Sequence, residues 1–260
     1  MRQSWGDFLR GAADHSHGVQ VYGDASELAD SVAAFLAAGF ERGQPAVVVA
    51  VPEHLRLFAE KLDGRGWSLA DAERDGLAVV ADAEQTLASL LGRDGPVPAR
   101  FEQGVGALLD AAERRRPGQP VRVFGEMVDL LARRDCLAAA DELERLWNAL
   151  ATKRRFSLLC GYRLDVFDMG AQSDALPHIC REHSHVLPAQ NYPRFARAVD
   201  DALREVLGPS QAASVYVVVS RIAAYERAPL AQSILMWVSE NLPAHSARIL
   251  DSARTHYAAA

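Results

Sequence analysis

The feature that most constrains the fold is a run of apolar residues, AVVVAV, at positions 46–51. A strand with apolar side chains on both faces must be covered on both faces, which is typical of parallel sheets. Shorter β-like runs occur at 19–22, 77–80, 121–124 and 156–160, and three of them contain one polar residue. Segments with helical spacing of apolar residues lie between these runs. The pattern therefore predicts strands that alternate with helices in an α/β fold, with a mostly parallel sheet covered by helices.

The pattern changes near residue 190. We expect the α/β domain to span residues 10–190 and a helical C-terminal extension to span residues 191–260. The extension carries seven arginines and six acidic residues, so its charge is nearly balanced and no basic DNA-binding surface is expected. We expect it to pack on the sheet domain, to form a homodimer contact or to bind a partner protein.

Composition narrows the class of protein. The chain has 260 residues, of which 49% are hydrophobic, and these are ordinary values for a globular protein. Its formal net charge of −6 disfavours direct nucleic-acid binding, because an acidic surface repels phosphates. The three cysteines are too few for a disulfide framework, and no apolar stretch reaches the roughly 20 residues of a membrane span. We therefore expect a cytoplasmic protein that does not enter a membrane.

The turn after the first predicted strand argues against nucleotide hydrolysis. A P-loop needs a glycine-rich turn that ends in Gly-Lys-Ser/Thr, whose amides and lysine hold the phosphates. Here the turn is Gly23-Asp24-Ala25-Ser26, which has one glycine, no lysine and an acid. Neither Lys61 nor Lys153 follows a glycine. We expect no catalytic activity, and residual nucleotide binding or ATPase activity remains as an alternative.

Ligands of parallel sheets usually bind beyond the carboxyl ends of the strands. Polar and aromatic residues follow several of the predicted strands at this edge. The predicted ligand-binding residues are Tyr22, Asp24, Glu126, Tyr162, His183 and His185. Structural roles are also open, since Glu126 is placed to cap the next helix and the tyrosines suit core packing.

Histidines form a second candidate site. His15 and His17 make one His-x-His pair, and His183 and His185 make another, with His178 and Cys180 just before it. Residues i and i+2 of a strand share a face, so each pair could chelate a metal, and imidazole with thiolate suits zinc or another transition metal. The alternative is a structural role, because a helix here would point His183 and His185 apart. The leading hypothesis expects no cofactor.

Three further residues have structural alternatives. Glu144 and Asn148 lie four residues apart on one face of a predicted helix. Glu144 could line a pocket and receive a polar ligand, or the two residues could make a contact on a solvated face. Cys160 ends an apolar strand and is expected to be a small core residue.

Several short motifs resemble the MEDS family, named for methanogens, methylotrophs and a dichloromethane-responsive regulator. The motifs run in the family's order: HGVQVY at 17–22, VRVFGEM at 121–127, LERLWN at 143–148, FSLLCGY at 156–162 and ICREHSHV at 179–186. The resemblance implies a RecA/KaiC-like fold without Walker motifs, and a sensory role in bacterial signalling or transcription control. The family often has His-x-Cys-x-x-Tyr in its first strand, whereas Val19 replaces the cysteine here.

These observations lead to one main hypothesis. The chain is expected to be a non-catalytic sensory domain in a bacterial regulatory pathway, which binds a small ligand or a signalling protein such as a kinase or regulator. The alternative of a different class is a metal-binding protein that uses the His-x-His pairs.

Overall fold

The computed structural model describes residues 5–187, 191–222 and 228–259. Contacts within the chain divide it into two units, Met1–Arg163 and Leu164–Ala260. We expected the boundary at residue 190, which itself lies outside the described residues. The first unit ends where the fifth strand of its sheet ends, because the segment after that strand packs mainly with the helices that follow it.

The first unit is built on a parallel sheet. Its strands are β1 (His17–Tyr22), β2 (Ala46–Ala50), β3 (Ala78–Asp82), β4 (Val121–Gly125) and β5 (Phe156–Arg163). Hydrogen bonding gives the order β3-β2-β4-β5-β1, and each neighbouring pair is parallel. Every residue of β2 and β4 is buried, as expected for strands covered on both faces, and this includes Arg122 of β4. The predicted α/β fold with a mostly parallel sheet is therefore confirmed.

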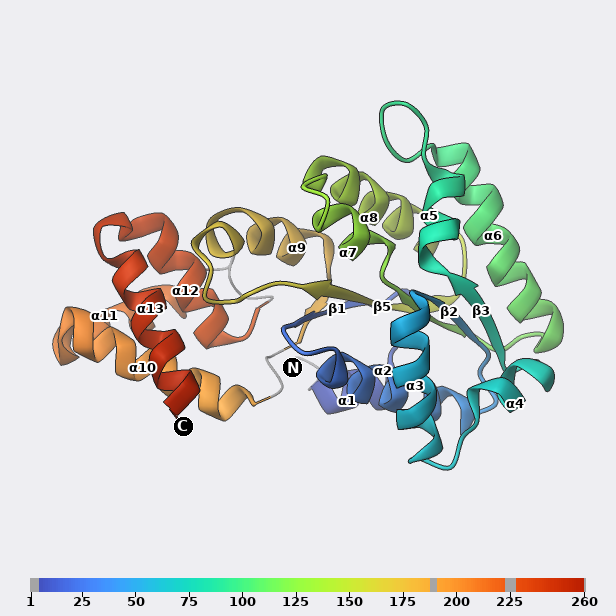
Figure 1. The fold of residues 1–260 in the computed structure, drawn as a ribbon, viewed down its shortest axis with the longest axis horizontal. Coiled ribbons are helices and arrows are strands. Elements are labelled where there is room, and N and C mark those ends of the chain that lie inside the picture. The colour runs from blue at the N-terminus through green and yellow to red at the C-terminus, as the bar shows by residue number, and fades with distance from the viewer. Residues whose placement is uncertain (1–4, 188–190, 223–227, 260) are drawn as a thin grey trace. The chain divides into compact units, whose positions relative to one another are not determined.

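Helices cover both faces of this sheet (Figure 1). On one side lie α1 (Trp5–Gly11), α2 (Ala25–Phe40) and α3 (Pro52–Asp63), and α4 (Leu69–Arg74) follows α3. On the other side lie α5 (Ala83–Leu90), α6 (Pro98–Arg115), α7 (Met127–Ala132) and α8 (Leu137–Ala151). Two faces covered by helices leave the carboxyl edge of the sheet as the place where strand ends and helix starts meet.

Close contacts hold the first helix against the sheet. Phe8 is fully buried and stacks on Phe35, with ring centroids 6.0 Å apart. The ring lies so close to β1 that a Cβ at Gly18 would be 2.4 Å from it. Arg122 is buried beneath α2 and donates to the carbonyl oxygens of Leu9 and Phe35, both at 2.7 Å. Burial lowers the pKa of Arg122 to about 10.

The second unit, Leu164–Ala260, consists mainly of helices. Its elements are a π-helical turn η1 (Ala171–Ala175), α9 (Leu176–Glu182), a two-residue strand β6 (His185–Val186), α10 (Tyr192–Leu207), α11 (Pro209–Val219), α12 (Leu230–Asn241) and α13 (Pro243–Ala259). Helices α10 to α13 enclose a hydrophobic core of their own, which includes Phe167, Phe195 and Ile249. Arg194 joins α10 to α13, because its guanidinium donates to the carbonyl oxygen of Tyr257 at 2.6 Å.

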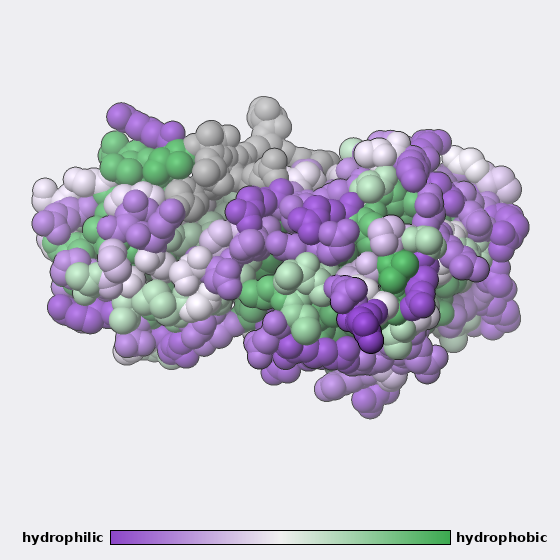
Figure 2. All heavy atoms as spheres, turned by 90° about the horizontal axis from the view of Figure 1, so that it is seen from above, coloured by the Kyte–Doolittle hydropathy of each residue, from purple (hydrophilic) through white to green (hydrophobic). Residues whose placement is uncertain are grey.

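The surface is largely polar. Figure 2 shows a face dominated by hydrophilic residues, with hydrophobic residues in small groups between them. Among the described residues, no helix combines the length and the apolar character that crossing a membrane requires.

Candidate functional site

The first candidate site lies where β2 and β4 end. Glu126 directly follows β4 and stands at the N-cap position of α7, but its side chain does not cap that helix. It turns instead to the end of β2, where its Oε1 accepts a hydrogen bond from the backbone N–H of Val51. Its Oε2 lies 2.5 Å from Nδ1 of His54, in the first turn of α3. Glu126 and His54 thus form a buried pair across two strand ends.

A second polar contact joins the ends of β1 and β5 to α7. The hydroxyl of Tyr22 donates to Oδ2 of Asp129 at 3.2 Å, and the backbone N–H of Arg163 donates to Oδ1 at 2.8 Å. Arg133 lies one turn further along α7, with its Nε 3.6 Å from Asp129. The rings of Tyr22 and His54 meet edge to face, with centroids 5.9 Å apart. We call Tyr22, His54, Glu126 and Asp129 the carboxyl-edge cluster.

The environment shifts the pKa values of this cluster. The hydrogen bond that His54 donates to Glu126 raises the pKa of His54 and outweighs the burial that would lower it. Burial raises the pKa of Asp129, and burial with the nearby carboxylates raises the pKa of Tyr22. The cluster therefore combines a neutral phenol, an imidazole that favours its charged form and two carboxyl groups. Perturbed ionisable groups of this kind gather at functional sites.

In the turn after β1, the side chain of Asp24 caps the helix that follows. Asp24 is exposed and is the N-cap of α2, where its Oδ1 accepts a hydrogen bond from the backbone N–H of Ser26 at 2.7 Å. A phosphate at a helix N-terminus would need those amide groups, and it would meet the carboxylate instead.

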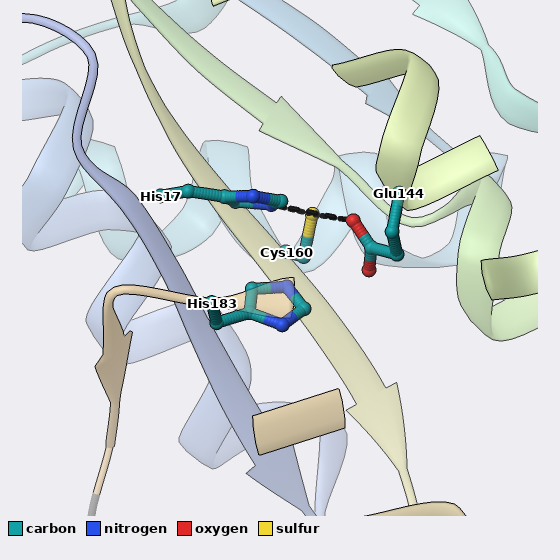
Figure 3. A group of neighbouring side chains, drawn as sticks. All are labelled: His17, Glu144, Cys160 and His183. Carbon is teal, nitrogen blue, oxygen red and sulfur yellow. Dashed lines mark hydrogen bonds and ion pairs between the residues drawn. The ribbon is translucent and has the colours of Figure 1, made fainter. Parts of the chain in front are cut away.

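The second candidate site lies between the sheet and α8 (Figure 3). His17 begins β1, Cys160 lies in β5 and Glu144 lies in α8. Nε2 of His17 is 3.3 Å from Sγ of Cys160 and 3.3 Å from Oε2 of Glu144, and Sγ is 3.9 Å from Oε2. All three side chains are buried. His183, drawn in the same view, belongs to the second unit, and the three side chains of the first unit are called the His-Cys-Glu cluster below.

Two neighbouring groups orient the His-Cys-Glu cluster. Nδ1 of His17 lies 2.9 Å from the side-chain oxygen of Asn148, one turn after Glu144 on α8. The hydroxyl of Tyr162 donates to the other carboxylate oxygen of Glu144 at 2.8 Å. Burial, followed by the charge of Glu144, raises the pKa of both the Cys160 thiol and the Tyr162 phenol well above their ordinary values. Without a bound cation, both groups keep their protons at neutral pH.

The structure separates the predicted metal ligands of the first pair. His17 points into the protein, whereas His15 is exposed, has a positive φ of 66° and makes its side-chain contact with the carbonyl oxygen of Ala151. The strand begins only at His17, so the two histidines do not share a strand face.

In the second unit, no three of the remaining predicted ligands gather as a metal site among the described residues. His178 and Cys180 lie on helix α9, where neighbours two apart point in different directions. Nδ1 of His183 contacts the carbonyl oxygen of Ile179 at 2.6 Å, and Nδ1 of His185 lies 2.9 Å from the hydroxyl of Ser184. Local chelation by the His-x-His pairs is therefore not the arrangement in the structure.

The structure places the predicted ligand-binding residues at different locations. Tyr22 and Glu126 meet in the carboxyl-edge cluster, Tyr162 contacts the His-Cys-Glu cluster, and Asp24 caps its helix. His183 and His185 belong to the second unit.

Sequence reasoning missed several members of the two clusters. His54 follows Pro52-Glu53 directly after a buried strand, and this position was a usable signal. The expected solvated face for Glu144 and Asn148 was wrong for Glu144, which is 1% exposed. Leu143 and Trp147 are buried on the same helix, so α8 turns a wider face inward than its apolar spacing alone implied. Cys160 is buried, as expected for a core residue, but it faces polar neighbours.

Comparison with known proteins identifies one family. The model for the MEthanogen/methylotroph, DcmR Sensory domain, abbreviated MEDS, matches residues 16–178. No curated protein matches the chain. A similar solved structure is an uncharacterized protein from Pyrococcus horikoshii in complex with an unknown peptide. That protein is 14% identical, with a TM-score of 0.48, and the match covers 71% of this chain and 83% of that one.

Proposed function

Because this chain belongs to the MEDS family of sensory domains, we propose that it binds a small signal molecule at the carboxyl-edge cluster and does not hydrolyse nucleotides. The observation that carries the proposal is the buried pair of Glu126 and His54, which joins the ends of two parallel strands to two helices. Buried ionisable groups are costly to keep, and proteins retain them mainly where they serve binding or switching.

The position of the cluster supports a sensory role. Tyr22 ends β1, Val51 follows β2, Glu126 follows β4 and Arg163 ends β5, so one ligand at this edge would touch several elements. A ligand that replaces the hydrogen bond between Tyr22 and Asp129, or the one between His54 and Glu126, would change how α3 and α7 are held. Such a change in α3 and α7 could transmit the binding signal to a partner protein.

The chemistry of the cluster indicates the class of ligand. Two carboxyl groups accept hydrogen bonds and disfavour a second anion nearby. We therefore expect a small neutral or cationic molecule that donates hydrogen bonds, such as an alcohol or a primary amine. The capped turn at Asp24 gives a triphosphate no set of free amides, which supports the absence of hydrolysis.

The second unit is the expected output surface. Helix α11 carries Val217 and Val218, whose exposed fractions are 50% and 42%. Exposed apolar side chains next to each other suit contact with another protein, so we propose that a kinase or a transcription regulator receives the signal there.

A thermal-shift screen tests the ligand proposal. The panel contains short alcohols, short primary amines, the matching carboxylic acids and ATP with magnesium, all measured on the full chain. We expect a rise in melting temperature with an alcohol or an amine and none with the acids, and no phosphate release from ATP. The same ligand should lose its effect on Glu126→Gln, which keeps the shape of the side chain and removes its charge.

A matched variant distinguishes ligand binding at the carboxyl-edge cluster from an effect of surface charge. Glu84 is an exposed carboxylate of α5 paired with Arg134, so Glu84→Gln removes one solvent-exposed charge and leaves the buried pair of Glu126 and His54 in place. A ligand effect that survives Glu126→Gln, or that Glu84→Gln removes equally, would place binding elsewhere. Steady ATP turnover by the wild-type chain would overturn the non-catalytic role.

A further inference from the structure

We propose that the His-Cys-Glu cluster is a zinc site, in which Nε2 of His17, Sγ of Cys160 and a carboxylate oxygen of Glu144 bind one Zn²⁺. The inference does not depend on the carboxyl-edge cluster, because the two clusters share no residue. It also differs from chelation by the His-x-His pairs, since two of its three ligands come from β5 and α8.

The distances fit a tetrahedral ion. Zinc binds nitrogen and oxygen at about 2.0–2.2 Å and sulfur at about 2.3 Å, so ligand atoms of a tetrahedral site lie roughly 3.3–3.7 Å apart. The separations here are 3.3, 3.3 and 3.9 Å. Three ligand atoms from two strands and a helix therefore already lie close to three corners of a tetrahedron, and small side-chain adjustments complete the fit.

Hydrogen bonds to neighbouring side chains orient the proposed ligand atoms toward one another. If Nδ1–H of His17 donates to the amide oxygen of Asn148, the Nε2 lone pair points at Cys160 and Glu144. Metal-binding histidines usually donate their other N–H to an oxygen in this way. Tyr162 occupies one oxygen of Glu144 and leaves the other toward the cluster. Asn148 and Tyr162 are thus positioning residues for the ligands.

Charge and protons balance on binding. As Zn²⁺ binds, the Sγ–H bond of Cys160 breaks, its proton passes to solvent and its electron pair forms the bond to zinc. The thiolate and the carboxylate then offset the two positive charges of the ion. Thiolate, imidazole and carboxylate are a donor set that zinc accepts, and one further donor would complete four-coordination.

Elemental analysis with metal titration tests the site on the full chain under reducing conditions. We expect one zinc per chain in the wild type and in Cys136→Ala, since Cys136 is an exposed free cysteine and serves as the matched control. Cys160→Ala should weaken zinc binding by more than the roughly 10–100-fold that loss of an outer partner costs. Asn148→Leu should fall within that smaller range.

Cobalt gives a readout that requires no variant to fold. The wild type loaded with Co²⁺ should show the intense visible bands of tetrahedral cobalt and a near-ultraviolet thiolate charge-transfer band. A wild-type chain that binds no zinc, or whose cobalt spectrum lacks the thiolate band, would overturn the proposal and leave His17 and Glu144 as a buried ion pair. Equal zinc affinity in wild type and folded Cys160→Ala would overturn it as well.

Discussion

The charge on Glu126 should control the pH dependence of stability. The carboxylate is 1% exposed and accepts two hydrogen bonds, from the N–H of Val51 and from His54. In Glu126→Gln the amide oxygen can still accept from Val51, and the amide nitrogen can donate to Nδ1 of a neutral His54. The variant therefore keeps both hydrogen bonds, but they now involve a neutral amide in place of the carboxylate.

The magnitude follows from that exchange. A hydrogen bond to a charged group contributes about 1.5–3 kcal/mol, and a neutral one contributes about 0.5–1.5 kcal/mol. Replacing the charged contact between Glu126 and His54 by a neutral one should cost about 1–1.5 kcal/mol while His54 is protonated in the wild type. An exposed pair such as Glu84 and Arg134 contributes much less, because water screens it.

The sign of the pH effect differs between the two proteins. Glu126 raises the pKa of His54 in the folded wild type, so the stabilisation is fully present below the unfolded pKa of about 6.5. It is lost as the pH rises through the folded pKa. In Glu126→Gln, burial becomes the main influence and lowers the pKa of His54, so stability should rise with pH up to the unfolded pKa of about 6.5 and stay level above it.

Urea unfolding at pH 6 and pH 9 measures both effects. We expect the midpoint of Glu126→Gln to lie well below that of the wild type at pH 6 and to approach it at pH 9, with unchanged slopes. Glu84→Gln should follow the wild type within about 0.5 kcal/mol at both pH values. An equal gap between wild type and Glu126→Gln at both pH values would refute the charged pair.

Three other changes test the packing and the sites. Gly18→Ala places a methyl group 2.4 Å from Phe8 and should destabilise the chain by about 1–3 kcal/mol in urea unfolding. The double variant that adds Phe8→Leu should recover part of this loss. No loss in the single variant would show that helix α1 moves freely. Asp24→Ala should cost about 1 kcal/mol through loss of the N-cap, measured the same way, and should not create ATP binding in a fluorescence titration. Tyr162→Phe should destabilise the metal-free chain by about 1.5–3 kcal/mol, because a buried carboxylate loses a hydrogen bond. It should also weaken zinc binding by about 10–100-fold in a competition assay with a chromophoric chelator; unchanged zinc affinity would remove Tyr162 from the site.

Much of the fold could be predicted from local patterns. The fully apolar run at 46–51 becomes the buried strand β2, and the similar run at 121–124 becomes β4. Parallel pairing followed from the helices between them, since a parallel connection needs a crossover. The family resemblance extended over most of the first unit, where the family model matches residues 16–178.

The two clusters were only partly predictable. Tyr22 and Glu126 were expected at the carboxyl edge because both follow strands, and strand ends of a parallel sheet share one edge. His54 was not chosen, because its place depends on how α3 leaves β2 and turns the imidazole toward Glu126. Spacing within a segment carries no information about a partner 72 residues away.

The sequence by itself determined which segments form strands and helices, because hydrophobic periodicity and turn residues act over a few neighbours. It also determined that the first turn lacks the lysine and glycines of a P-loop. Only the tertiary structure decided which polar side chains meet. His17, Glu144 and Cys160 come from three elements, and their side chains face one another because β1 pairs with β5 and α8 covers them. Such contacts depend on the register of β1 against β5 and on the rotation of α8, which are properties of the packed chain and of no single segment.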